Sequence, residues 1–149
     1  MSATQIKTHQ NFIGGQWVDS VTGRTYEVHN PARTSQVVGQ FQTSGAEDAL
    51  RAVAAAKEGL AVWANTPAPA RANIIYKALE IMGRRADELA KTITIEEGKP
   101  ITDAHGEVKR AMNIMEYAAG EGRRMFGYTT PSELPNTVAY TCLLYTSDA

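Results

Sequence analysis

The only cysteine in the sequence is the first candidate for chemistry. A thiolate can act as a nucleophile, and Cys142 is the sole thiol among the 149 residues. No histidine stands near it to serve as a base. His9, His29 and His105 are widely separated, and none has a second ligand at metal spacing. The sequence therefore predicts neither a catalytic cysteine nor a metal site, and a single cysteine cannot form an internal disulfide.

Acidic pairs and glycine pairs are the next candidates for acid/base or phosphate-binding groups. The acidic candidates are Glu96, Glu97, Asp87, Glu88 and Glu107. Such pairs on helices usually form a solvated face, and i,i+4 spacing gives Asp87 a partner in Lys91 and Glu80 a partner in Arg84. No helix follows Gly14-Gly15, and Met125 occupies the place of the third glycine after Gly120-x-Gly122. We expect surface ion pairs and turn or packing glycines.

The elements that would position a site begin with short strands. Gly14-Gly15 separates residues 11–13 from residues 16–18, a pattern that predicts a tight hairpin. A second pair of strands is predicted at 25–29 and 37–42, on either side of Asn30-Pro31, and a last one at 137–141.

From Ser44 the apolar period changes to about 3.6, which indicates helices. Ser44 and Glu47 form a capping-box pattern, and Glu47 is predicted to pair with Arg51. The expected core stripe of this first helix is Leu50, Val53, Ala54, Ala61 and Ala64. Pro67 and Pro69 are expected to end it.

Two further helical segments follow. The second runs through 75–93, with Gly83 bending or splitting it and Gly98 ending it in a left-handed conformation. Pro100 is expected in the first turn of the third. Its core face is predicted to be Ile101, Ala104, Val108, Ala111, Met112, Met115 and Ala119. Arg110, Ile114 and Tyr117 share the opposite face, where two large apolar residues suggest cover from outside this segment.

Composition narrows the class of protein. Hydrophobic residues make up 43% and charged residues 21%, which is typical of a soluble globular chain. The net charge of -1, without a basic run, predicts no nucleic-acid partner. No run approaches the roughly 20 apolar residues of a membrane helix, and the polar start lacks a signal-peptide core. We therefore expect a cytoplasmic protein without a membrane partner.

Seven short motifs, in order, resemble the start of the aldehyde dehydrogenase superfamily over residues 12–141. They are Phe12-Ile13-Gly14-Gly15-Gln16-Trp17-Val18, Asn30-Pro31-Ala32, Trp63, Arg71-Ala72, Glu96-Glu97-Gly98-Lys99-Pro100, Gly106-Glu107-Val108 and Tyr117-Ala118-Ala119-Gly120-Glu121. Each is weak alone, and their shared order makes the match specific. The run 121–140 is most similar to semialdehyde dehydrogenases, including those for α-ketoglutaric and succinic semialdehyde.

The resemblance implies an α/β fold, with a β-hairpin region followed by three or four helices. These would form part of a Rossmann-like cofactor-binding domain that is incomplete here. In that family a cysteine thiolate attacks the aldehyde, hydride passes to NAD or NADP, and a glutamate activates water. All these groups lie downstream in the family. We therefore expect no catalytic, cofactor-binding or metal-binding residue in this chain, and no cofactor bound to the fragment.

Arg110 is the one residue to which the resemblance gives a functional role. In the family its helix borders the substrate tunnel, so Arg110, Ile114 and Tyr117 are substrate-tunnel candidates. A guanidinium there could pair in bidentate fashion with the carboxylate of a semialdehyde acid. The alternative, a structural or inter-domain ion pair, stays open because surface arginines commonly form one.

The last eight residues, 142–149, depart from the family pattern. They resemble the in-frame translation of a transposase sequencing adapter, so residues 1–141 are expected to be the aldehyde dehydrogenase part and 142–149 a non-native tail. The parent protein is expected to oxidise a small-molecule aldehyde as a homodimer or homotetramer, and the fragment to be inactive. Two alternatives remain: a self-contained helical binding or scaffold domain, and a non-enzymatic member of the superfamily.

Overall fold

The chain begins with five short strands, continues with consecutive helices and ends in a short β-ribbon. A computed structural model describes residues 6–142. In chain order the elements are β1 Thr8–His9, β2 Asn11–Ile13, β3 Gln16–Val18, β4 Thr25–Asn30, β5 Arg33–Gln42, α1 Ala46–Ala64, α2 Ala68–Arg84, α3 Ala86–Glu97, α4 Ile101–Glu121, β6 Thr129–Thr130 and β7 Ala139–Tyr140. The expected α/β class is confirmed, with four helices in the described range.

The predicted hairpin is present as β2 and β3. The two strands pair antiparallel, with Phe12 opposite Trp17 and their ring centroids 5.0 Å apart. Gly14 and Gly15 have φ values of 61° and 79°. Both turn residues therefore occupy the left-handed region, where a side chain is disfavoured, and this explains the glycine pair.

The second strand pair belongs to a three-stranded sheet in the order β1-β5-β4. β4 and β5 run antiparallel, and β1 lies parallel to the other edge of β5. β5 begins at Arg33, earlier than the sequence predicted. The turn before it is tight because the side-chain oxygen of Asn30 accepts a hydrogen bond from the Ala32 N–H at 2.9 Å.

The start of α1 corrects the predicted capping box. The N-cap is Gly45, and the carboxylate of Asp48, not of Glu47, accepts the Gly45 N–H at 3.1 Å. The hydroxyl oxygen of Ser44 instead accepts a hydrogen bond from the side-chain amide of Asn11 at 2.8 Å. Arg51 approaches Asp48 at 3.9 Å, so the predicted partner Glu47 was also wrong.

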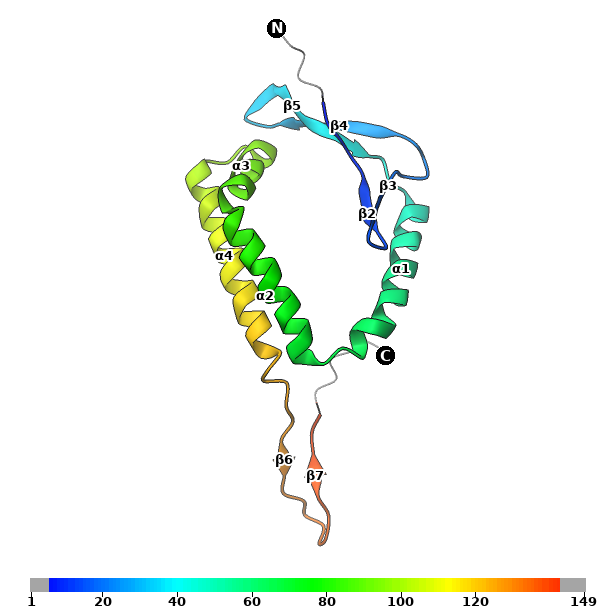
Figure 1. The fold of residues 1–149 in the computed structure, drawn as a ribbon, viewed down its shortest axis with the longest axis vertical. Helices are drawn as coiled ribbons and strands as arrows, with labels where there is room; N and C mark the ends of the chain where they lie inside the picture. The colour runs from blue at the N-terminus through cyan, green and yellow to red at the C-terminus, as the bar shows by residue number, and fades with distance from the viewer. Residues whose placement is uncertain (1–5, 143–149) are drawn as a thin grey trace.

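The predicted core stripe of α1 was wrong as well. Leu50 and Val53 are 69% and 52% exposed. They lie roughly opposite Asp48 at about 100° per residue, and α1 meets the hairpin on its Asp48 side. Figure 1 shows α1 on one side of the molecule and the α2–α4 pair on the other, with β4 and β5 at one end. Four residues of the stripe are therefore exposed, and only Ala64 at the end of α1 is partly buried.

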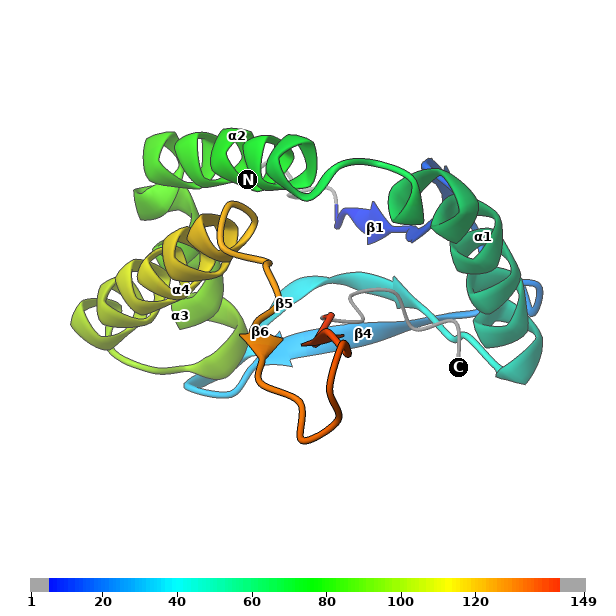
Figure 2. The same cartoon turned by 90° about the horizontal axis from the view of Figure 1, so that it is seen from below.

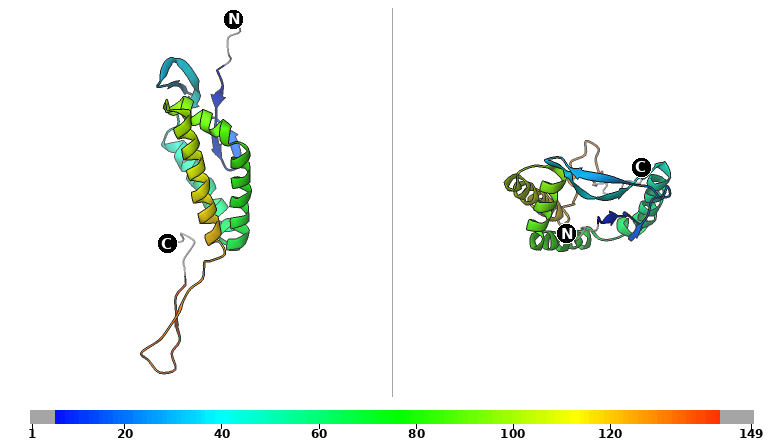
Figure 3. Two further views of the ribbon diagram at one scale, coloured as in Figure 1. Left: turned by 90° about the vertical axis from the view of Figure 1, so that its left-hand side faces the viewer. Right: turned by 90° about the horizontal axis from the view of Figure 1, so that it is seen from above.

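The remaining helices form one packed group, seen from below in Figure 2. The split near Gly83 falls at Arg85, between α2 and α3. Gly98 ends α3 with φ 75°, as predicted, and Pro100 precedes α4 as its N-cap instead of entering the first turn. α4 packs on both α2 and α3. The left view in Figure 3 shows α4 beside α2 and the β6–β7 ribbon projecting beyond them.

The core of the described residues is small. Its buried apolar members are Ala72, Ala90, Ala104, Val108 and Ala119, and no large side chain among the described residues is fully buried. The chain has 11543 Å² of accessible surface, whereas a compact monomer of 16.2 kDa has about 7,500 Å². An excess of this size means that many apolar side chains face solvent. No helix in residues 6–142 is both long and apolar enough to cross a membrane.

Candidate functional site

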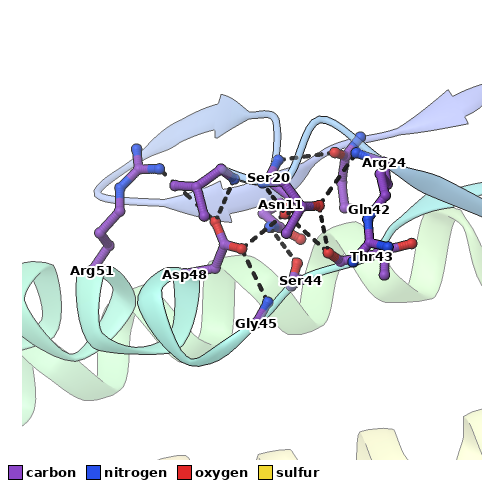
Figure 4. A network of polar contacts seen from close by, with 11 residues as sticks. Asn11, Ser20, Arg24, Gln42, Thr43, Ser44, Gly45, Asp48 and Arg51 are labelled. Carbon is purple, nitrogen blue, oxygen red and sulfur yellow. Dashed lines mark hydrogen bonds and ion pairs between the residues drawn. The ribbon is translucent and has the colours of Figure 1, made fainter.

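The most connected polar group is Asp48 at the start of α1, shown in Figure 4. This side chain is only 3% exposed. Its oxygens accept hydrogen bonds from the Val21 N–H at 3.0 Å, the Ser20 hydroxyl at 2.8 Å and the Gly45 N–H. These bonds, the Val21 N–H foremost, hold the pKa of the carboxyl below its usual value. An ionised, fully engaged carboxylate anchors a helix and is a poor general base.

Gln42 extends the same network toward the strands. Its side-chain oxygen accepts the Ser20 N–H at 2.9 Å, and its side-chain amide donates to the carbonyl of His9 and to the carboxylate of Asp19, each at 3.2 Å. The network therefore ties α1, β5 and the segment before β4 together. The sequence predicted that Ser44 and Glu47 cap α1. Placing the N-cap one residue later, at Gly45, would have predicted Asp48 as the capping carboxylate.

Two of the family-like motifs meet at the α3–α4 junction. A Cβ placed on Gly98 would lie 2.9 Å from Cγ of Pro31 and 3.0 Å from the backbone nitrogen of Ala32. The Asn30 turn therefore rests against the glycine that ends α3. Next to it, the ammonium of Lys99 contacts Glu97 at 2.6 Å and also pairs with Glu107.

The acidic candidates take structural roles at this junction and along the helices. Hydrogen bonds to Glu107 and Glu97 raise the pKa of Lys99. Arg85 pairs with Glu88 and lowers the pKa of that carboxyl. Glu80 pairs with Arg84 as predicted. Asp87 faces His105 at 3.8 Å, on the neighbouring helix, where Lys91 was the expected partner.

The glycines near the end of α4 serve helix packing. A Cβ on Gly122 would lie 2.6 Å from Cβ of Ala72 and 2.9 Å from the carbonyl oxygen of Ala68. The turn is thus closed by α2, and its backbone N–H groups bond to the carbonyls of Ala119 and Gly120. This geometry does not fit a dinucleotide phosphate. Among residues 6–142 no group of His, Cys, Asp and Glu could hold a metal ion, and Cys142 is exposed.

Two hollows in the described part of the chain do not coincide with a reactive cluster. One of about 180 Å³ lies between the end of α1, the start of α2 and the end of α4. At its edge the Arg71 guanidinium lies 5.8 Å from the ring centre of Trp63. Another, of about 480 Å³, lies between β5 and α3 and is lined mainly by Val37, Val38, Phe41 and Ile95. The sequence motifs contained Trp63 and Arg71 but did not predict their contact.

The three substrate-tunnel candidates lie together on one exposed face of α4. Arg110 is exposed, and Ile114 and Tyr117 are 58% and 72% exposed. They are turned away from Ala104 and Val108, through which α4 meets α3. Of the predicted core face of α4, Ala104, Val108 and Ala119 are buried, but Ile101 is 39% exposed and Ala111 is also exposed, so the prediction was wrong for these two residues. The second, exposed face is observed as expected. Arg110 makes no ion pair with any other residue in the described part of the chain, so its guanidinium is available to an acidic group.

Known proteins match both the sequence and this arrangement. Malonate-semialdehyde dehydrogenase of Bacillus pumilus is 40% identical over 88% of this chain and 27% of its own length. Alpha-ketoglutaric semialdehyde dehydrogenase of Bacillus subtilis is 40% identical over 93% of this chain and 28% of its own. A crystal structure of succinate-semialdehyde dehydrogenase from Burkholderia pseudomallei superposes with a TM-score of 0.83 and 33% identity, covering 93% of this chain and 28% of that one.

The matches identify the family of this chain but cover only part of the length of its relatives. The chain spans little more than a quarter of the length of these relatives. Residues 17–143 match the aldehyde dehydrogenase family over most of the chain, and the protein therefore belongs to that family.

Proposed function

We propose that this chain is the amino-terminal part of an enzyme that oxidises an aldehyde to a carboxylate with NAD or NADP. Support comes from the family match and from relatives that are named as aldehyde dehydrogenases. The cofactor supplies the hydride acceptor. No residue of this chain is assigned to holding it, so the chain alone is proposed to be inactive. The parent is proposed to be a cytoplasmic homodimer or homotetramer, and residues 142–149 to be a non-native tail, of which 143–149 lie outside the described range.

We further propose that the substrate is a semialdehyde acid. One observation carries this: Arg110 is an exposed cation without an ionic partner in residues 6–142, on a helix face that also presents Ile114 and Tyr117. A guanidinium binds a carboxylate in bidentate fashion, and apolar neighbours strengthen the pair by excluding water. Relatives named for malonate and α-ketoglutaric semialdehyde act on aldehydes that carry such a carboxylate.

The test joins this chain to the remainder of a related enzyme and changes Arg110→Ala. Hydrogen bonds to a charged group contribute about 1.5–3 kcal/mol, so kcat/KM for an acidic semialdehyde should fall about tenfold or more. The activity toward a neutral aldehyde of similar length should change little. Lys109→Ala, which removes a neighbouring exposed cation, is the control. Equal losses for acidic and neutral aldehydes would remove the assignment of Arg110.

The scaffold alternative finds less support. A self-contained domain buries large side chains in its own core, and here the buried apolar residues are four alanines and one valine.

A further inference from the structure

An ion pair at the α3–α4 junction lies less than one helical turn from Arg110. The ammonium of Lys99 pairs with Glu107 on α4 and contacts Glu97, the last residue of α3, at 2.6 Å. The Lys99 side chain is 23% exposed, whereas the two carboxylate side chains are about half exposed. Lys99 is therefore the inner member of the group and holds Glu107 from the side of the junction.

The helical neighbours of Arg110 include one acidic residue. On a helix, a side chain meets the residues three and four positions away. For Arg110 these residues are Gly106, Glu107, Asn113 and Ile114. Of the four, only Glu107 carries a charge, and an acid placed before a base is the favourable order on a helix. Glu107 is thus the residue of α4 best placed to neutralise Arg110.

Helix geometry directs Arg110 toward this carboxylate. Long side chains on a helix point back toward its amino terminus and cover the turn before their own position. That turn holds Glu107 and Gly106, and nothing lies within 4 Å of a Cβ placed on Gly106. Asp103, on the same side of α4, is about 10 Å further along the axis. Even so, Arg110 forms no ion pair with Glu107 or with any other residue in 6–142.

We infer that Lys99 is a positioning residue for substrate binding. It pairs with Glu107, and this keeps the charge of Arg110 available to the carboxylate of a semialdehyde acid. Without Lys99, Glu107 would lose its one ion pair within residues 6–142 and would compete with the substrate for the guanidinium. This inference rests on the proposed function, because Arg110 is the group proposed there to bind the substrate.

The expected effect of losing Lys99 is modest. Acid–base pairs at this spacing on an exposed helix are weak, and one of that strength would occupy Arg110 in roughly 60–70% of the molecules. The apparent affinity falls in proportion to the fraction of molecules that can bind. KM for an acidic semialdehyde should therefore rise about two- to threefold.

The kinetic test uses this chain fused to the remainder of a related enzyme. Lys99→Met should raise KM for an acidic semialdehyde about two- to threefold more than KM for a neutral aldehyde. Adding Glu107→Gln should remove this rise. Adding Glu97→Gln instead restores the same net charge but leaves the competing carboxylate, so KM should stay raised. Arg84→Met, which breaks the pair with Glu80 on α2, is the control and should change neither KM.

A second measurement needs no substrate. The signal of the Arg110 side-chain Nε–H group is followed by nuclear magnetic resonance in the full chain. Lys99→Met should shift this signal, because Glu107 then pairs with the guanidinium. Glu107→Gln should return the signal in the Lys99→Met variant and should move it much less when Lys99 is present.

Two results would overturn the inference. One is an Arg110 signal that Lys99→Met leaves unchanged. The other is that Glu97→Gln restores KM as fully as Glu107→Gln does, since net charge alone would then explain the effect. If the Arg110 signal shifts as expected while KM for the acidic semialdehyde does not rise, the role of Arg110 in the proposed function fails, and the control of Arg110 by Lys99 stands.

Discussion

Two glycine-to-alanine substitutions in and next to α4 should change stability in opposite directions. In Gly122→Ala the new Cβ would lie 2.6 Å from Cβ of Ala72 and 2.9 Å from the carbonyl oxygen of Ala68. Ordinary van der Waals contact between carbons needs about 3.5–4.0 Å. The carbonyl belongs to the backbone and cannot rotate away, so α2 and α4 must separate. Gly122 itself has φ -58°, so backbone strain plays no part.

The magnitude follows from the packing. Overpacking a close contact costs about 1–3 kcal/mol. Gly106 provides the control, because it lies inside α4 and a Cβ there meets nothing within 4 Å. Gly106→Ala should therefore stabilise the helix by about 0.5–1 kcal/mol, through the lower backbone entropy of the unfolded chain. The two variants should differ by about 1.5–4 kcal/mol.

Urea unfolding followed by circular dichroism at the helix band measures this difference. The midpoint of Gly122→Ala should fall below that of the unaltered chain, and the midpoint of Gly106→Ala should rise above it. If both variants shift the midpoint upward, α2 and α4 are not in close contact at Gly122, and the description of the packed helices is wrong.

Two further predictions concern the junctions between the strands and the helices. Gly98→Ala combines a positive φ with a clash against Pro31, whereas Gly23→Ala has a positive φ and open space around it. Backbone strain should lower the free energy of unfolding of both variants by about 1 kcal/mol, and the clash should lower that of Gly98→Ala by about a further 1 kcal/mol or more. Urea unfolding measures both values. Asp48→Asn should destabilise the chain at neutral pH, because the lowered pKa of Asp48 means that the folded state favours the ionised carboxylate. This contribution to stability is complete above the ordinary carboxyl pKa of 3.8 and is lost as the pH falls through the lower pKa of the folded state, so the thermal midpoints of Asp48→Asn and the unaltered chain should converge in acid. A gap that stays constant with pH would show that the shape of the side chain, and not its charge, is responsible. Glu47→Gln, on the same turn, is the control.

Local signals along the chain determined where most elements lie. The Gly14-Gly15 turn, the proline break at Pro67 and the left-handed Gly98 were all predictable, because backbone restrictions of glycine and proline act within a few residues. The period of apolar residues likewise predicted α4 and its second exposed face. The family could be recognised from ordered motifs without any knowledge of their contacts.

Tertiary structure alone decided which groups those elements bring together. Ser44 was expected to cap α1, but its hydroxyl accepts a hydrogen bond from the side-chain amide of Asn11, more than thirty residues earlier. Asp48 accepts the Gly45 N–H at the start of α1 instead. The stripe around Leu50 was expected in the core, yet α1 turns its Asp48 side to the hairpin. Capping and burial depend on partners that are distant in sequence, and a hydrophobic period shows only that a face prefers cover. Which surface provides that cover depends on the folded arrangement, and the described residues leave Leu50 and Val53 of α1 exposed.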